Sequence, residues 1–301
     1  MINAYAAMEA GGALEPWEYD PGALQATEVE VKVEHCGICH SDLSMLQNEW
    51  GVATFPLVAG HEAIGTIAAV GDSVSNLALG DRVGLGWQSS YCNTCAYCMT
   101  GDHNLCPEAE RTIIGRHGAF ADKVRADAAS DVRPPSNLGA RTAGPLFCAG
   151  ITVFNPLVQF NVSPGARVGV VGLGGLGHLA LQFCNAESIS SAAGSLDLIL
   201  CTVSADLDWG LYLSTLRPKG RLHFVGAVMQ PLQIMVPQIM RGQLSVSSSP
   251  VGSPSTIAQM LEFAARHDIR AQTEHYSFDG INEALAHLDS GNARYRIVLS
   301  H

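Results

Sequence analysis

A glycine-rich turn between an apolar strand and a helix constrains the fold of this chain more than any other feature. Residues 166–171 are mostly apolar, as expected for a strand of a parallel sheet that is buried on both faces. They run directly into the glycine-rich segment 172–177, and a helix is expected from His178 onward. The order strand, G-x-G-x-x-G, helix predicts a Rossmann-type dinucleotide-binding domain, and a glycine turn without a ligand is the weaker alternative. The residues expected to approach a cofactor pyrophosphate at the helix N-terminus are Gly172, Gly174, Gly175, Leu176 and Gly177.

The segment after this helix is too short for an ordinary dinucleotide-binding fold. A second strand, a helix and a third strand should follow, and one βαβ unit needs roughly 30 residues. Only residues 188–195 separate the expected helix end near Glu187 from the next strand, residues 196–203. Asp197 lies at the sequence distance from the glycines that is typical of the acidic residue that binds the cofactor ribose. However, it begins that strand, whereas the ribose-binding residue is found at the carboxyl end of a strand. We therefore expect a shortened domain that lacks its second and third strands, which leaves its first strand as a new sheet edge.

Two short stretches carry the residue types that bind zinc. The first is the run His35-Cys36-Gly37-Ile38-Cys39-His40-Ser41-Asp42, and the second is Gly60-His61-Glu62. A catalytic zinc site takes three protein ligands and leaves a fourth position open for water or substrate. Cys148 is a candidate third ligand, although a lone cysteine is more often buried in a core. Spacing alone does not decide between these roles.

Four further cysteines follow the spacing Cys-x2-Cys-x2-Cys-x7-Cys, at Cys92, Cys95, Cys98 and Cys106. Four thiolates this close together can enclose one Zn²⁺ ion tetrahedrally with no open position, which is a structural site. An iron–sulfur cluster is the main alternative, because Cys-x2-Cys-x2-Cys resembles part of a ferredoxin sequence. The lack of a further Cys-Pro ligand set favours zinc, while Cys106-Pro107 keeps the alternative open.

Composition excludes several classes of function. A chain of 301 residues exceeds one ordinary core, so two domains are expected, and 47% hydrophobic residues suffice to bury them. The net charge of -11, with no Lys/Arg-rich run, argues against nucleic acid and against an anionic membrane surface. Nine cysteines, an odd number found mostly in tight groups, indicate metal binding rather than disulfides. Because no leader-like or membrane-spanning apolar run is present, we expect a cytoplasmic protein.

The first 80 residues are expected to form strands with closely spaced turns. Val29, Val31 and Val33 alternate with charged residues, which is the period-2 pattern of a half-buried strand. The dipeptides Gly71-Asp72 and Gly80-Asp81 are typical of turns. This pattern predicts a small barrel-like β domain at the start of the chain.

Taken together, these motifs resemble a zinc-dependent medium-chain alcohol dehydrogenase of the cinnamyl-alcohol-dehydrogenase-like aldehyde reductase branch. The matching segments occur in the family's order over nearly the whole chain: 36–43, 60–62, the four-cysteine lobe, 146–152, 172–177 and 294–296. The resemblance implies a GroES-like catalytic domain over residues 1–145 and 275–301, with the zinc lobe at about 90–107, and a shortened Rossmann-type cofactor domain over 146–274. It also implies a homodimer, with the strand near residues 245–249 as a candidate interface.

The resemblance assigns the metal ligands. Cys39, His61 and Cys148 would hold the catalytic zinc, and Cys36 would be structural. Glu62 would stand next to the metal or exchange onto it. A zinc-free quinone or enoyl reductase of the same superfamily is disfavoured, because such enzymes do not need this set of three ligands.

The resemblance also assigns the groups around the metal. Asp42 would orient the ligating histidine, and Ser41 would pass on the alcohol proton. His40 and Arg296 would face the cofactor pyrophosphate. The family's proton relay usually ends in a histidine where this chain has Ser44, so water would take over that step.

The expected function is an oxidoreductase that interconverts aldehydes and primary alcohols by hydride transfer with NADP(H) or NAD(H). Zinc would polarise the carbonyl as a Lewis acid, with two zinc ions per chain and NADP favoured over NAD. The expected partners are a small-molecule aldehyde or alcohol and a second copy of the chain. The alternative is a catalytically impaired, zinc-binding remnant of the family that acts as a binding or structural protein. Trp50 and Trp87 are candidates to line an apolar substrate pocket, although core packing is the commoner role of tryptophan.

Overall fold

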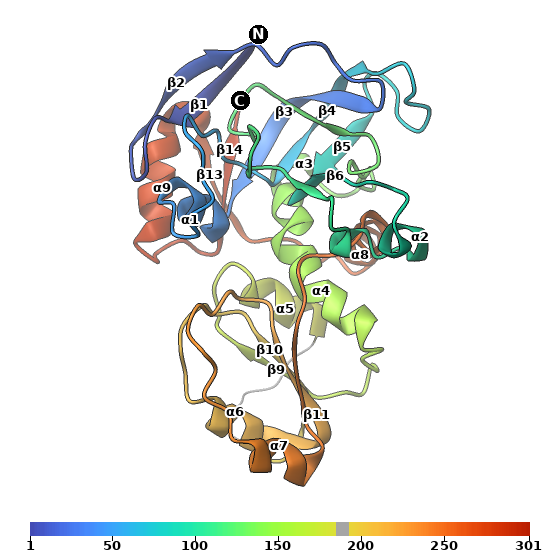
Figure 1. The fold of residues 1–301 in the computed structure, drawn as a ribbon, viewed down its shortest axis with the longest axis vertical. Helices are drawn as coiled ribbons and strands as arrows, with labels where there is room; N and C mark the ends of the chain where they lie inside the picture. The colour runs from blue at the N-terminus through green and yellow to red at the C-terminus, as the bar shows by residue number, and fades with distance from the viewer. Residues whose placement is uncertain (185–192) are drawn as a thin grey trace. The chain divides into compact units, whose positions relative to one another are not determined.

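The computed structural model describes residues 1–184 and 193–301, and Figure 1 shows their course. They form two compact units, one of residues 1–149 and 252–301 and the other of residues 150–251. The sequence places residues 252–274 in the cofactor domain, whereas the structure places them in the first unit. Helix α8 (Pro254–Arg266) is anchored there, since the Asn137 side chain donates a hydrogen bond to the Ala265 carbonyl at 3.1 Å. None of the helices in the described ranges is long and apolar enough to cross a membrane.

The first unit is organised around a six-stranded sheet. Its strand order is β13-β14-β3-β4-β5, and β8 pairs with β3 as well. The alternating valines at 29, 31 and 33 lie in β3 and are at most 2% exposed, so the strand predicted from their spacing is confirmed. The strands of this sheet are β3 (Glu28–Ile38), β4 (Ala63–Val70), β5 (Arg82–Leu85), β8 (Lys123–Asp127), β13 (Thr273–Ser277) and β14 (Arg296–Ser300).

Two short two-stranded ribbons and several helices complete the first unit. The two-stranded ribbons are β1 (Ile2–Ala7) with β2 (Leu14–Tyr19), and β6 (Gln88–Ser90) with β7 (Glu110–Arg111). The helical elements are α1 (His40–Leu46), α2 (Ala96–Thr100), η1 (His103–Leu105), α3 (Ala140–Ala143), η2 (Gly144–Phe147), α8, η4 (Phe278–Gly280) and α9 (Ile281–Asp289). A single large hydrophobic core connects the ribbon β1–β2 with the main sheet.

Three strand ends meet at one place in the first unit. Strand β3 ends at Ile38, which pairs with Ile297 at the start of the antiparallel strand β14. On the other side of β3, Cys36 pairs with Ala63 at the start of β4. Residues that follow β3 and residues that precede β4 and β14 are therefore brought together, although β14 lies more than 200 positions after the other two strands in the chain. This convergence positions the candidate metal centre.

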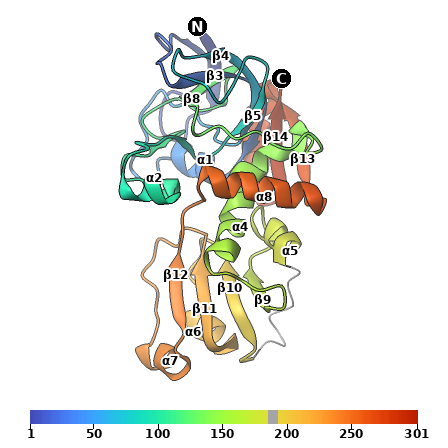
Figure 2. The same cartoon turned by 90° about the vertical axis from the view of Figure 1, so that its right-hand side faces the viewer.

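The second unit contains a four-stranded parallel sheet, whose strands lie side by side in Figure 2. The order is β12-β11-β10-β9, and among the described residues β9 (Val168–Val171) pairs only with β10 (Leu196–Cys201). The other strands are β11 (Leu216–Phe224) and β12 (Ser245–Ser248), and the helices are α4 (Ala149–Gln159), α5 (Gly177–Cys184), α6 (Trp209–Thr215) and α7 (Val236–Gly242). The short connection that the sequence predicts between Glu187 and Leu196 falls largely on residues 185–192, which lie outside the described residues.

Candidate metal centre and cofactor turn

Four ligand groups gather at the convergence of β3, β4 and β14. Cys39, His61, Glu62 and Cys148 are all buried, and one ligand atom from each lies within 4.8 Å of the others. The Sγ atoms of Cys39 and Cys148 are 3.9 Å apart, and His61 Nε2 is 3.3 Å from Cys148 Sγ. Two thiols, one imidazole nitrogen and a nearby carboxylate are a donor set that suits zinc. The structure thus brings together the predicted ligands, and Cys36 is not part of this group.

In the turn from β3 into α1, a single carboxylate accepts the hydrogen bond that positions Cys39. Cys39 caps α1, and its backbone N–H donates to Asp42 Oδ2 at 2.8 Å. The other oxygen, Asp42 Oδ1, accepts from the backbone N–H of Gly60 at 2.9 Å and lies 2.9 Å from His61 Nδ1. Burial lowers the pKa of His61, but the charge and the hydrogen bond of Asp42 outweigh this effect and raise it. A metal at Nε2 would displace the proton there, while the Nδ1–H stays donated to Asp42. Asp42 therefore fixes both the position of one ligand and the tautomer of another.

The two thiols differ in acidity. The hydrogen bond from Cys148 lowers the pKa of Cys39 well below that of an ordinary thiol, although burial opposes this effect. The same hydrogen bond, together with burial, raises the pKa of Cys148. The thiolate is the form of cysteine that binds metal, so Cys39 is prepared for ligation. Zinc competes with protons for these atoms, and zinc binding here is expected to release protons.

Arg296 lies at the metal centre in the first unit. It is only 3% exposed, and its guanidinium forms a buried ion pair with Glu62 Oε1. Burial raises the pKa of Glu62, and the positive charge of Arg296 counteracts this increase. The other carboxylate oxygen, Oε2, has no hydrogen-bond partner among the described residues. The sequence did not predict this ion pair, and the assignment of Arg296 to the cofactor pyrophosphate stays a prediction.

Glycine is required beside this carboxylate. A Cβ atom built on Gly37 would overlap Glu62 Oε2, and one built on Gly144 would lie 2.6 Å from the Glu62 carbonyl oxygen. The backbone N–H of Gly37 also donates to the Glu62 carbonyl at 3.0 Å. Small residues on two elements therefore let the Glu62 segment approach β3 closely.

The predicted proton-transfer residues surround Cys39. Ser41 is partly exposed, and its Oγ lies 3.8 Å from Cys39 Sγ. His40 is exposed on the first turn of α1. Ser44, at the position where the family places a histidine, is buried and donates a hydrogen bond to Glu49 Oε2 at 2.6 Å.

Two tryptophan rings lie beside the metal centre. The Trp87 ring packs edge-on against the His61 ring, with 5.0 Å between the ring centres, and the Trp50 ring packs edge-on against Trp87, with 6.0 Å between the ring centres.

The contacts of Asp42 predict a measurable effect on metal affinity. Replacing Asp42 with asparagine keeps one acceptor oxygen but loses the charge that holds the Nδ1–H tautomer of His61. We expect Asp42→Asn to weaken zinc binding at this centre by roughly 10–100-fold. Chelator competition would measure this change. Ser44→Ala is the matched control on the same helix, and equal affinities of the two variants would contradict the role of Asp42.

The four predicted lobe cysteines form a second cluster. Their ligand atoms also lie within 4.8 Å of one another, with Cys106 Sγ 3.5 Å and Cys98 Sγ 4.0 Å from Cys92 Sγ. Hydrogen bonds from the backbone N–H groups of Thr94 and Cys95 lower the pKa of Cys92 to about 6. Within residues 1–184 and 193–301 this group consists of the four thiols alone, which fits a closed structural zinc site.

In the second unit, the glycine-rich turn follows the carboxyl end of β9, as predicted. Gly172 has a φ of +94°, and a Cβ atom on Gly177 would overlap the Gly172 carbonyl oxygen. The Thr202 hydroxyl, just beyond β10, donates to the Val171 carbonyl at 2.8 Å and so fixes the start of the turn. The turn presents the N-terminus of α5, where free backbone N–H groups favour an anion.

This close packing predicts the effect of one substitution. A valine at position 177 would push the start of α5 away from the turn. We expect Gly177→Val to weaken cofactor binding by at least about tenfold, which corresponds to ~1.4 kcal/mol. Fluorescence titration with NADPH would measure the loss. Gly165→Ala is the control, because a Cβ atom there meets no atom within 4 Å; equal weakening in both variants would refute the prediction.

Comparisons with known proteins agree with this architecture. Two family models match, the alcohol dehydrogenase GroES-like domain over residues 25–136 and the zinc-binding dehydrogenase over residues 185–266. The chain is 53% identical to aldehyde reductase AdhA of Synechocystis sp., over 100% of this chain and 99% of that protein. It is 36% identical to probable cinnamyl alcohol dehydrogenase 8D of Oryza sativa, over 98% and 93% of the two chains.

Solved structures show the same likeness. The cinnamyl alcohol dehydrogenase SbCAD4 of Sorghum bicolor matches with a TM-score of 0.94 and 34% identity, over 99% of this chain and 97% of that chain. The CAD of Helicobacter pylori, solved in complex with NADP(H), has the same fold, with a TM-score of 0.92 and 24% identity over 99% and 97%.

A GroES-like domain, a Rossmann-type sheet and a cysteine–histidine metal centre define the zinc-binding dehydrogenases. The chain belongs to this family and is a zinc-dependent alcohol dehydrogenase-type oxidoreductase. The resemblance inferred from the sequence motifs is thereby confirmed.

Proposed function

We propose that this protein reduces aldehydes to primary alcohols, and catalyses the reverse reaction, with a preference for NADP(H). The observation that carries the proposal is the buried group of Cys39, His61 and Cys148, which gathers the ligand set of a catalytic zinc in one place. Support for the direction and the substrate comes from the 53% identical aldehyde reductase of Synechocystis sp.. The NADP(H) complex of the Helicobacter pylori relative supports the cofactor preference.

Residues around the metal are assigned to metal binding, proton transfer and cofactor binding. Zinc, when bound, supplies Lewis-acid polarisation of the carbonyl oxygen. Cys39, His61 and Cys148 hold it, and Ser41 is placed to exchange a proton with the alcohol oxygen. Asp42 positions the ligands. The exposed imidazole of His40 stands on the same turn as Ser41 and is assigned to the cofactor phosphates. Together with the four-cysteine lobe, this assignment gives two zinc ions per chain.

The aromatic side chains next to the metal centre favour apolar substrates. Trp87 contacts the ring of His61 and Trp50 contacts Trp87, and both tryptophans are partly exposed. Such rings offer a flat apolar wall beside the reacting group. We therefore expect aromatic and medium-length aliphatic aldehydes to be better substrates than acetaldehyde, which a comparison of kcat/KM values would test.

A shortened cofactor domain is part of the proposal. The alignment with the Synechocystis relative extends over 333 positions, whereas this chain has 301 residues, so at least 32 positions are gaps in this chain. Among the described residues β9 pairs only with β10 and is an edge strand, which is the arrangement expected if the second and third strands, which would lie on its other side, are absent. The adenosine side of the cofactor site would then be reduced, so weaker cofactor binding than in full-length relatives is expected. We further propose a cytoplasmic homodimer with β12 at its interface.

Cofactor titration is the experiment that tests the proposed function. The zinc-loaded protein should enhance NADPH fluorescence with a saturable dependence and should oxidise NADPH in the presence of benzaldehyde. Saturable binding without turnover would support the alternative of a catalytically impaired remnant. No binding at millimolar NADPH would exclude the dehydrogenase function for this chain.

A further inference from the structure

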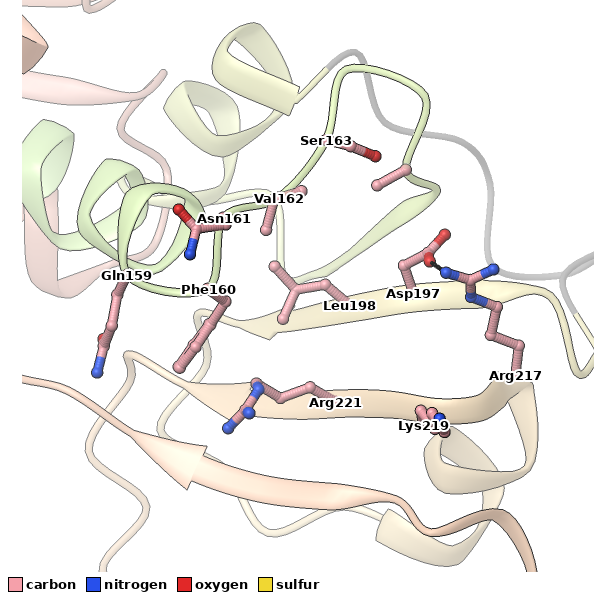
Figure 3. A pocket seen from close by; sticks show the side chains of 11 residues that line it. Gln159, Phe160, Asn161, Val162, Ser163, Asp197, Leu198, Arg217, Lys219 and Arg221 are labelled. Carbon is pink, nitrogen blue, oxygen red and sulfur yellow. Dashed lines mark ion pairs between the residues drawn. The ribbon is translucent and has the colours of Figure 1, made fainter.

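A polar cavity of about 480 Å³ lies in the second unit, beside the amino ends of β10 and β11 (Figure 3). One wall comes from the segment after α4 and the other from the first residues of the two strands. Its charged and aromatic lining residues are Phe160, Asp197, Arg217, Lys219 and Arg221. Cavities that bind small molecules span roughly 300–1,000 Å³, so this one can hold a small metabolite.

A bulge in β11 brings the positive charges to this cavity. Leu196 pairs with Leu216 and Leu198 pairs with Arg221, so residues 217–220 of β11 stand opposite the single residue 197 of β10. In this turn Lys219 has a φ of +67°, a left-handed conformation that is uncommon for a lysine. Such conformations persist where the surroundings impose them, and they concentrate at functional sites.

Among the described residues, a carboxylate neutralises only one of the three positive charges that line the cavity. Asp197 forms an ion pair with Arg217, and its Oδ2 also accepts a hydrogen bond from the backbone N–H of Arg167 at 2.9 Å. Within residues 1–184 and 193–301, Lys219 and Arg221 form no ion pair with a carboxylate. The cavity is therefore positively charged in a protein whose net charge is -11.

The guanidinium of Arg221 is held in a defined orientation. Its Cζ lies 3.9 Å from the centre of the Phe160 ring, and its Nη1 donates a hydrogen bond to Ser247 Oγ at 3.0 Å. The nearby His223 is buried, and this burial together with the charge of Arg221 lowers its pKa to about 4. His223 is therefore neutral at pH 7. The Arg221 guanidinium retains further N–H donors that can bind an oxyanion such as phosphate.

This cavity is separate from the cofactor turn of the same unit. The glycine turn follows the carboxyl end of β9, whereas the cavity is lined by Ala166, which precedes β9. The four residues of β9 span roughly 13 Å at ~3.3 Å per residue. We propose that the cavity is a second binding site that takes the phosphate group of a small phosphorylated metabolite, held by Lys219 and Arg221. A phosphate dianion matches the two uncompensated charges, and its binding does not require the dehydrogenase site.

Calorimetric titration of the zinc-loaded, full-length protein tests this site. The probes are inorganic phosphate and glycerol 3-phosphate, with succinate as a dicarboxylate for comparison, each with and without saturating NADPH. We expect saturable binding of both phosphate probes, weaker binding of succinate, and no competition from NADPH. Lys219→Asn and Arg221→Gln should each weaken phosphate binding by about tenfold, because each removes one charge-assisted contact.

The variants are chosen to preserve the fold. Asparagine tolerates the left-handed backbone at position 219, and glutamine at position 221 keeps a donor for Ser247. Arg241→Gln, which removes an exposed charge from α7 outside the cavity, is the matched control and should bind phosphate as the parent protein does. Unchanged phosphate affinity in both cavity variants would overturn the proposal. Displacement of phosphate by NADPH would also overturn it, because it would place the anion at the glycine turn.

Discussion

Cys148→Ser is expected to abolish turnover while leaving the four-cysteine zinc in place. Cys148 supplies a sulfur that lies near both other proposed ligands, with His61 Nε2 at 3.3 Å and Cys39 Sγ at 3.9 Å. Loss of Lewis-acid assistance is worth several kcal/mol, so kcat/KM for an aldehyde should fall by about a thousandfold or more. Metal analysis should show that the zinc content drops from two ions to one per chain.

A neighbouring cysteine provides the control for this variant. Cys36 is fully buried on β3 and belongs to the same sequence motif as Cys39, but it lies outside the ligand group. Cys36→Ala should therefore keep both zinc ions and most of the activity, at a modest cost in stability for the lost packing. Retained turnover in Cys148→Ser, or loss of a zinc ion in Cys36→Ala, would show that the ligand assignment is wrong.

Local motifs made much of the fold predictable from the sequence. The alternating valines predicted β3, and the apolar run before the glycines predicted β9. Both predictions were possible because the burial of a strand is visible in the pattern of a few consecutive residues. The residue types Cys39 and His61 likewise signalled a metal centre. The proposed third ligand, Cys148, needed the family resemblance, since it is 109 residues from Cys39 and has no local pattern of its own.

Contacts between distant segments were not predictable in the same way. The pair Glu62–Arg296 joins residues 234 positions apart, and it exists because β4 and β14 begin on either side of the end of β3. The sequence alone does not show which arginine side chains become buried. The stacking of Arg221 on Phe160 was missed for the same reason, because it depends on how α4 approaches the sheet.

The buried pair of Glu62 and Arg296 predicts the largest effect on stability. Glu62 is 0% and Arg296 3% exposed, so removing the guanidinium leaves a carboxylate buried without its countercharge. Breaking a buried ion pair on one side typically costs about 3–5 kcal/mol. We expect Arg296→Met to lower the free energy of unfolding by this amount at pH 7, measured by urea denaturation of the zinc-loaded protein.

A second substitution and a change of pH identify the source of that loss. Without Arg296, burial raises the pKa of Glu62 further above its ordinary value, so the folded state binds a proton that the unfolded state has released. Stability of Arg296→Met should therefore fall as the pH rises from 5 to 8, relative to the parent protein. Glu62→Gln combined with Arg296→Met removes the buried charge and should recover a large part of the loss. If the deficit is the same at both pH values, or if the double variant is no more stable than Arg296→Met, then lost packing rather than the unpaired carboxylate accounts for the effect.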